Sequence, residues 1–367
     1  MSKTVLHFAD FKSPCRGNFI NSLEALREAV GERGWNTVYV FPAATAGRDW
    51  AQELGRQTAV YYLSGRFLAD LKLLRRVIKR HDVSLIHHHF YKLPYVLLFD
   101  LAAWGKKIPQ LIHLHCALHI HQGPARVIEK FLLRGKAFIG CSEKLTDDAK
   151  RFYPKNPAFT AKNAIFFPRL EQFEPLDKAA LGLRENAKTL MLFGFLYEVK
   201  GVDLALEALE SLNRTGDAAD LILILTSNRE AIREKITQRF GAIPAWLHLL
   251  PPRNDIASYF RLCDLFLAPS RSEGLPYSVL EAAWLKVPTV LSDIPAHTAL
   301  ALPCASFFPC GNASALTEKI RQILRSPPSE ARLTAQSEAV FREYRLEEWI
   351  KTVLNIYDKQ LKNRRFS

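Results

Sequence analysis

Residues 264–293 read DLFLAPSRSEGLPYSVLEAAWLKVPTVLSD and carry the pattern of a strand, a helix and a second strand. The apolar run at 265–268 predicts a buried strand, the segment 276–286 predicts a helix, and TVLSD at 289–293 predicts the second strand. Pro276 suits the start of that helix, because proline is tolerated at the first helical position. Buried strands separated by helices are typical of parallel sheets covered on both faces, so this stretch predicts one unit of such a sheet.

The same alternation runs through the chain in two series. The strand-like runs of the first series are TVLHFAD, NTVYVFP, VSLIHHHF, PQLIHLHC and AFIGCSE, from residue 4 to residue 143. Those of the second series, which begins at residue 188, are KTLMLFGF, DLILILTS, LHLLPP, DLFLAPS and TVLSD. Two series predict an α/β protein with two doubly wound, Rossmann-like domains, and a length of 367 residues with 48% hydrophobic content can support two cores. We place an N-terminal domain at 1–170, a C-terminal domain at 171–345, a last helix at 346–367, and a linker within 166–187.

The cysteines and the apolar runs indicate the compartment. The six cysteines have no paired spacing, which is typical neither of a disulfide framework nor of a zinc knuckle, and which suits a reducing environment. The N-terminus enters a strand-like run without the pattern of a signal peptide. No apolar run reaches the ~18 residues that span a bilayer. We therefore expect a cytoplasmic protein.

The charge is distributed unevenly. Of 50 Lys and Arg and 37 Asp and Glu, residues 1–170 hold 26 and 13, which leaves 24 of each for the remainder. The whole net charge of +13 thus lies in the first half, which indicates an anionic partner, either a membrane surface or a nucleic acid. A generally basic, solvated surface is the alternative. Aromatic residues do not interleave with the cations as base-stacking platforms would, so we expect no nucleic acid.

Two basic amphipathic stretches could face a membrane. One is the helix predicted over 66–81, and the other is ARVIEKFLLRGKAF at 125–138. We expect their apolar stripes to pack on the sheet and their basic faces to lie on an anionic bilayer. The cations of the first helix are Lys72, Arg75, Arg76, Lys79 and Arg80.

The loop and helix start at 272–282 predict a phosphate site. The first amides of the helix are unpaired, and together with the helix dipole they favour an anion, while Gly274 permits close backbone approach. Glu273 and Glu281 are eight residues apart, roughly 12 Å along a helix, too far for the carboxyl pair of a glycosidase. Two carboxylates on either side of a phosphate suit a nucleotide sugar, whose hydroxyls flank its diphosphate. The alternative is a loop charge and a solvated helix residue. The loop after the first strand lacks G-x-G-x-x-G, which argues against a dinucleotide enzyme.

Three stretches carry a resemblance to a known family. SEGLPYSVLEA at 272–282 resembles the E-x7-E motif of retaining, GT-B-fold glycosyltransferases of family 4. FGFLYEVKGVDLALEAL at 193–209 is similar to that family's glycine, variable loop, Lys-Gly and following helix. IPQLIHLHC at 108–116 resembles its strand that ends in a functional histidine.

The resemblance implies a role for individual residues. Glu273 would hold the donor sugar, Glu281 the ribose, and Lys200 the leaving diphosphate, while His115 would lie near the reacting sugar. Phe195 stands where the family commonly has an arginine, and Arg271 is a candidate to replace that cation. The remaining donor-binding candidates are Gly17, Asn18, Gly194, Gly274, Leu275, Pro276, Tyr277 and Ser278.

The resemblance also implies no cofactor and no metal, since the nucleotide sugar is a substrate. Histidines cluster at 87–89 and again in HLHCALHIH, which is the pattern that could suggest a metal. That second cluster comprises His113, His115, His119 and His121, with Cys116 among them. No D-x-D-like pair stands where a metal-dependent transferase would need one, and Asp147-Asp148 lies in an apparently helical segment. We expect no metal site.

The implied function is retaining transfer of a sugar, with UDP as the expected nucleotide, to a glycan acceptor that is carried on a lipid at the inner face of the cytoplasmic membrane. Such a reaction would serve bacterial envelope polysaccharide or lipooligosaccharide synthesis. The last helix resembles the family's helix that crosses back to the first domain. A non-catalytic nucleotide-sugar-binding protein, a phosphorylase-type enzyme and a transferase acting on a soluble sugar remain alternatives.

Overall fold

The computed structural model describes residues 3–118, 120–225 and 227–363. Contacts divide the chain into two compact units. The first runs to Ala164 and includes the C-terminal helix from Leu346, and the second is Ile165–Arg345. The division thus lies at Ala164, whereas the expected boundary was residue 170. None of the helices in the described part of the chain combines the length and the apolarity needed to cross a membrane.

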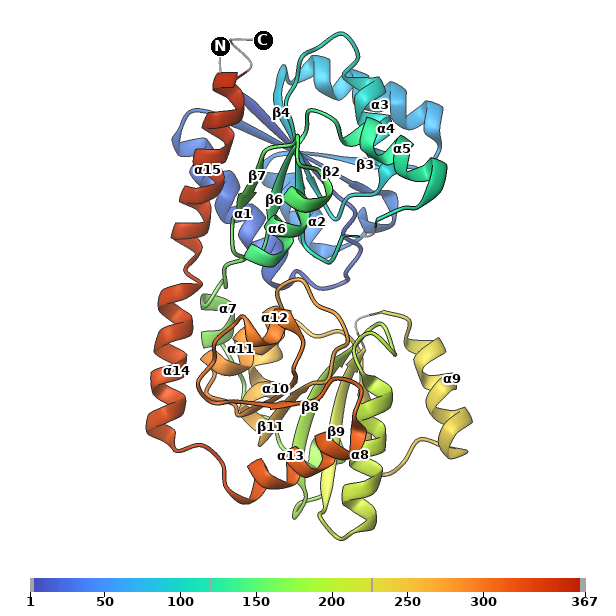
Figure 1. Cartoon of the computed structure of the whole chain (residues 1–367), viewed down its shortest axis with the longest axis vertical. Coiled ribbons are helices and arrows are strands. Elements are labelled where there is room, and N and C mark those ends of the chain that lie inside the picture. Colours follow the sequence, from blue (N-terminus) through green and yellow to red (C-terminus); the bar gives the residue numbers. More distant parts are fainter. Residues whose placement is uncertain (1–2, 119, 226, 364–367) are drawn as a thin grey trace. The chain divides into compact units, whose positions relative to one another are not determined.

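The first unit is built on a seven-stranded parallel sheet with the order β3-β2-β1-β4-β5-β6-β7 (Figure 1). Strand β1, which lies between β2 and β4, is buried over its whole length, as its largely apolar composition predicts. The order reverses between β1 and β4, and the loops after these two strands therefore start at the switch point, where such sheets bind ligands. The strands are β1 (Thr4–Ala9), β2 (Asn36–Pro42), β3 (Ala59–Leu63), β4 (Val83–His89), β5 (Gln110–Leu114), β6 (Ala137–Gly140) and β7 (Ala158–Thr160).

Helices cover both faces of this sheet (Figure 1). Apolar side chains of α1 and the C-terminal α15 pack on one face, and those of α3 and α4 pack on the other. α15 contacts α1 and β4, so the last helix belongs to the first unit. The helices are α1 (Gly17–Glu32), the short η1 (Ala43–Thr45), α2 (Asp49–Gln57), α3 (Phe67–Arg80), α4 (Leu93–Ala102), α5 (Gly123–Leu133), α6 (Glu143–Phe152) and α15 (Leu346–Asn363).

The second unit has a six-stranded parallel sheet with the order β10-β9-β8-β11-β12-β13. Residues 264–293 form β11, α11 and β12 here, and β11 pairs in parallel with β12. The strands are β8 (Lys188–Gly194), β9 (Ala219–Leu225), β10 (Leu247–Leu250), β11 (Leu265–Ala268), β12 (Thr289–Ser292) and β13 (Ala305–Phe308). The helices are α7 (Pro168–Glu171), η2 (Ala179–Leu181), α8 (Val202–Arg214), α9 (Arg229–Phe240), α10 (Ile256–Leu262), α11 (Tyr277–Trp284), α12 (Pro295–Thr298), α13 (Ala313–Arg325) and α14 (Glu330–Glu343).

The predicted α/β class with two doubly wound sheets is confirmed, but two details differ. The expected linker 166–187 is part of the second unit, because its Phe167, Leu170 and Leu183 are buried in that unit's core. Pro276 has an extended backbone and caps α11 from outside, so the helix begins at Tyr277.

Candidate functional site

Two glycines shape the loop that carries Lys200. Gly201 has a φ of +65°, and a Cβ there would lie 2.1 Å from the carbonyl oxygen of Pro269. A Cβ on Gly194 would lie 2.8 Å from Leu223 Cδ1. With any other residue type at position 201, the loop could not approach the end of β11 as closely as it does. The amide of Arg271 donates to the carbonyl of Val199 at 2.8 Å and ties the two loops together.

Lys200 and Glu273, which the sequence motifs predicted as site residues, form an ion pair. Lys200 Nζ lies 2.5 Å from Glu273 Oε1, and the same oxygen accepts a hydrogen bond from Ser270 Oγ at 2.7 Å. The two side chains are only 13% and 12% exposed. Phe195 lies at the other side of the ammonium, with its ring centroid 4.6 Å from Nζ, in a cation–π contact. The pair is thus held in place, yet it remains accessible beside the start of α11.

Glu281 lies inside α11 and is almost fully buried. Its side chain is 5% exposed, and its carboxylate forms an ion pair with Arg169 of α7. Arg169 is a residue that no sequence motif indicated. A buried carboxylate requires such a partner, since an unpaired charge there would be costly. Arg169 fixes the direction of Glu281, and any ribose would have to share this carboxylate with the guanidinium.

Arg271 has a partner of its own. Its guanidinium binds both carboxylate oxygens of Asp203, at 2.8 and 2.6 Å, and it also donates to the carbonyl of Glu198. The hydrogen bonds to Asp203 raise the pKa of Arg271. The candidate to replace the arginine that is absent at Phe195 is therefore balanced by a carboxylate in this structure.

His297 is a further buried polar residue that the sequence did not single out. Its Nδ1 lies 2.9 Å from the carbonyl oxygen of Ser292, and burial lowers its pKa although the charge of Glu273 opposes this. Ser292 Oγ in turn donates to the carbonyl of Ser270, the residue whose hydroxyl holds Glu273. These contacts hold the loop after β11 in place through the backbone of Ser270.

In the first unit, Gly17 and Asn18 stand at the start of α1. Gly17 has a φ of +56°, with open space where a Cβ would be. Asn18 is 5% exposed, and its Nδ2 donates to the carbonyl of Ala164 at 2.5 Å. The side chain of Asn18 thus has a structural partner, while the positive φ at Gly17 sets the entry into the helix.

His115 lines a cavity of about 490 Å³ in the first unit, after the ends of β1, β4 and β5. Asp10 and Lys92 also line it, and their carboxylate and ammonium are 2.6 Å apart. Glu129 closes another side and is bonded to Arg126 at 2.7 Å. The cavity therefore offers charged groups and one imidazole to a polar ligand.

Five imidazoles form one cluster, and two of them, those of His113 and His115, line this cavity. His7 Nδ1 is 3.1 Å from His89 Nε2, His89 Nδ1 is 3.1 Å from His115 Nε2, and His87 Nε2 is 3.2 Å from His113 Nδ1. Burial lowers the pKa of His7 and of His115 to about 3, and it also lowers those of the other three. All five are therefore neutral near pH 7.

This cluster contains two groups that could hold a metal ion. Nitrogens of His7, His87 and His89 lie within 4.8 Å of one another, and so do those of His89, His113 and His115. Three imidazoles suit zinc, and the same separations of 3.1–3.2 Å also suit hydrogen bonds between neutral imidazoles. The sequence had not included His7 in the cluster. His121 lies apart, against Glu129, and the predicted member His119 lies outside the described residues.

Comparison with solved structures shows the same fold. A glycosyltransferase of Rickettsia africae matches with a TM-score of 0.79 and 16% identity, over 99% of each chain. Anabaena HepE, solved in complex with UDP and glucose, matches with a TM-score of 0.76 and 17% identity, over 97% of this chain and 100% of its own.

Curated relatives are similar over shorter stretches. One is N,N'-diacetylbacillosaminyl-diphospho-undecaprenol alpha-1,3-N-acetylgalactosaminyltransferase of Campylobacter jejuni, 29% identical over 54% of this chain and 52% of the relative. Another is UDP-Gal:alpha-D-GlcNAc-diphosphoundecaprenol alpha-1,3-galactosyltransferase of Escherichia coli, 27% identical over 36% of each. The matched segments span between 30% and 56% of the curated relatives' lengths.

Two family models divide the chain much as the two units do. The model of Glycosyltransferase Family 4 matches residues 21–165, and that of Glycosyl transferases group 1 matches residues 173–340. The second match contains Lys200, Glu273 and Glu281, and the first contains His115. The chain therefore belongs to the group 1, family 4 glycosyltransferases.

Proposed function

We propose that this protein is a retaining glycosyltransferase that moves a sugar from a nucleotide sugar, most simply a UDP-sugar, to a lipid-linked glycan in bacterial envelope polysaccharide or lipooligosaccharide synthesis. The observation that carries the proposal is the Lys200–Glu273 pair beside the start of α11. A cation, a carboxylate and the positive end of a helix dipole together match a diphosphate and the hydroxyls of the sugar attached to it. The UDP complexes of HepE and the UDP-Gal donor in the name of the Escherichia coli relative support the choice of nucleotide.

In the proposed reaction the bond between the sugar's anomeric carbon and the diphosphate breaks as the acceptor oxygen bonds to the same face of the sugar. The acceptor's proton passes to the leaving diphosphate oxygen. Lys200 and the first amides of α11 stabilise the negative charge that develops there, and Glu273 orients the sugar through its hydroxyls. These groups supply the positive charge that a metal would otherwise provide, so we propose a metal-independent enzyme.

We also propose that the first unit binds the acceptor and lies on an anionic membrane from the cytoplasmic side. The names of both undecaprenol-linked relatives support a lipid-carried acceptor. The six cysteines are free thiols, which suits a reducing compartment. The cavity beside His115 offers the charged pair of Asp10 and Lys92 to a polar glycan.

The membrane-facing surface would be formed by α3, α4 and α5, in which α4 packs against both other helices (Figure 1). We name it the α3–α5 face. Contrary to the expectation that its stripe packs on the sheet, α5 exposes Phe131 by 75%, and Trp104 after α4 is 80% exposed. The exposed apolar residues of the face are Phe67, Leu68, Leu97, Trp104, Val127, Ile128 and Phe131. The rest of the α3 stripe, with Leu74 and Ile78, is buried as predicted.

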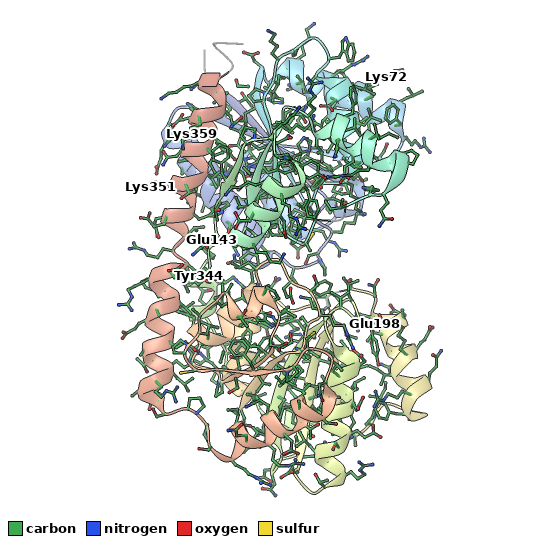
Figure 2. The ribbon with its side chains drawn as sticks, viewed as in Figure 1. Lys72, Glu143, Glu198, Tyr344, Lys351 and Lys359 are labelled. Atoms are coloured by element: carbon green, nitrogen blue, oxygen red, sulfur yellow. The ribbon has the colours of Figure 1, made fainter. Side chains whose placement is uncertain are left out.

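The charge of the α3–α5 face complements anionic lipid. Lys72 lies on the outer side of α3 (Figure 2), and exposed cations follow along the three helices and their ends. They are Arg66, Lys72, Arg75, Arg76, Lys79, Arg80, Lys106, Lys107, Lys130 and Arg134. Asp70 accepts backbone hydrogen bonds, Asp100 pairs with Lys136, and Glu129 pairs with Arg126. The carboxylates within α3, α4 and α5 are thus engaged internally, and apolar anchors among cations are typical of interfacial binding.

A screen of nucleotide sugars tests the catalytic proposal. We expect one donor to bind with EDTA present and to be slowly hydrolysed, and we expect Glu273→Ala to abolish turnover while free nucleotide still binds. Isothermal titration and product analysis measure the two separately. Failure of every nucleotide and nucleotide sugar to bind would refute the proposal. Binding without turnover, even with lipid-linked acceptors, would instead indicate a nucleotide-sugar-binding protein.

Vesicle cosedimentation tests the α3–α5 face. The double change Ile128→Ser and Phe131→Ser should weaken binding to vesicles with phosphatidylglycerol at least about tenfold, because each buried large apolar side chain contributes roughly 1.5–3 kcal/mol. Binding of the wild type should also fall with salt, since each cation near the surface contributes about 1 kcal/mol. Phe341→Ser is the matched control, because Phe341 is 46% exposed on the other unit. Equal binding by the double variant and the control would contradict the assignment.

A further inference from the structure

The five clustered histidines share one face of the first sheet because of strand register. His7 pairs with His87 across β1 and β4, and His89 pairs with His113 across β4 and β5. Side chains two residues apart on a strand point to the same face, so His115 joins the same row. His88 points to the opposite face, where its Nε2 contacts Gln110 at 2.8 Å.

Within the cluster, His7, His89 and His115 form one continuous hydrogen-bonded chain. His89 lies in its middle, with Nε2 against His7 Nδ1 and Nδ1 against His115 Nε2. A neutral imidazole has one N–H and one lone pair. Each N···N contact therefore needs one protonated and one bare nitrogen, and the direction of one bond fixes the direction of the next.

The two hydrogen bonds that link His7, His89 and His115 can run in either direction, and the buried nitrogen at the His7 end selects between these directions. Nε2 of His7 is buried and has no hydrogen-bond partner. If the bonds ran from His115 towards His7, that nitrogen would carry an orphaned N–H, whereas the opposite direction leaves only a bare lone pair. Buried donors without partners are rarer than acceptors without partners. The bonds therefore run from His7 Nδ1–H to His89 Nε2, and from His89 Nδ1–H to His115 Nε2.

We propose that His7 and His89 are positioning residues that hold His115 as the tautomer protonated on Nδ1, so that His115 donates a hydrogen bond into the cavity it lines. Nε2 of His115 accepts from His89, and no group in the described part of the chain bonds Nδ1. The ligand atom opposite Nδ1 is then an acceptor oxygen, such as a sugar hydroxyl or ring oxygen. A proton on Nδ1 also removes His115 as a general base for the acceptor hydroxyl. The identity of the ligand rests on the proposed function, whereas the tautomer does not.

Nitrogen NMR of the full chain with ¹⁵N-labelled histidine tests the tautomer directly. We expect His115, identified by the signals lost in His115→Asn, to show a protonated Nδ1 and a bare Nε2. His7→Leu removes the first donor, so signal should shift towards protonated Nε2 in His115. His7→Asn places an amide N–H near the position of Nδ1 and should restore the wild-type pattern. His88→Asn, a buried change on the opposite face, should leave the pattern unaltered.

Three results would overturn the proposal: protonated Nε2 in wild-type His115, an unchanged His115 pattern in folded His7→Leu, or a stoichiometric metal ion in the purified protein by mass spectrometry. If His7→Leu does not fold, the wild-type spectrum alone decides. As a second readout, His7→Leu should lower kcat for sugar transfer about tenfold with little change in KM, because the hydrogen bond from His115 to the ligand in the cavity is lost. Should no nucleotide sugar bind at all, the proposed function fails while the tautomer assignment still stands on the spectrum.

Discussion

Replacing Lys200 with alanine lowers kcat/KM for sugar transfer by about 10²–10³-fold, the cost of removing one preorganised charge from a transition state. Lys200 is 2.5 Å from Glu273 and 4.6 Å from the ring centroid of Phe195, so its ammonium is fixed before a donor arrives. Arg271 does not easily replace the lost charge, because its guanidinium already binds Asp203 and the carbonyl of Glu198. The measurement is steady-state transfer with the donor that the nucleotide-sugar screen identifies.

The matched control is Lys235→Ala in the same unit. Lys235 also forms an ion pair with a glutamate, Glu198, but it is 45% exposed on α9 and should change turnover less than about twofold. Glu198 is labelled in Figure 2 at the edge of this unit. A rescue variant sharpens the test, because Phe195→Arg combined with Lys200→Ala returns a cation to the position where the family commonly has one. Equal activity of Lys200→Ala and Lys235→Ala would rule out the assigned role of Lys200.

The sequence predicted those parts of the fold that are coded by local periodicity. β1 and β9 are largely apolar, and they are fully buried in the structure. The predicted series omitted β3, whose residues are mostly half-exposed at the sheet edge, the three-residue β7 and the four-residue β13. All three are short strands at the edge of a sheet, and an edge strand gives a weaker burial pattern because it is covered on fewer sides. The buried part of 166–187 was interpreted as a linker for the same reason: isolated residues such as Leu170 pack without a period.

The candidate residues of the site were predictable where a motif contains them, but several of their partners were not. Glu273 and Lys200 lie in separate motifs, and the structure brings their side chains together, as the phosphate-site interpretation requires. The partner of Glu281 is Arg169, 112 positions away, and no local pattern marks it. The exposed stripe of α5 shows a different limit, since periodicity identifies an apolar face but does not tell whether protein or lipid covers it. The direction of the histidine chain depends on one unpaired nitrogen, which only coordinates reveal.

Among small substitutions in the second unit, Gly201→Ala should cause the largest loss of stability and of turnover. At a φ of +65° a non-glycine residue costs roughly 1–2 kcal/mol. The new Cβ would also lie 2.1 Å from the carbonyl oxygen of Pro269, so one loop must move, at a further cost of roughly 1–3 kcal/mol. We expect a clear loss in the free energy of unfolding, measured by urea denaturation, and a loss of donor turnover at least as large as that of Lys200→Ala.

Gly216→Ala separates the backbone cost of a positive φ from the cost of the steric overlap with Pro269. Gly216 has a φ of +88°, but nothing lies within 4 Å of where its Cβ would be, so this variant carries the backbone cost without the overlap. Its free energy of unfolding should fall by roughly 1–2 kcal/mol, and its turnover should stay near that of the wild type. Equal losses of stability in the two variants would show that the close approach at Pro269 is unimportant. A larger loss for Gly201→Ala, together with lost turnover, means that the glycine serves the site by allowing the loop of Lys200 to reach the end of β11.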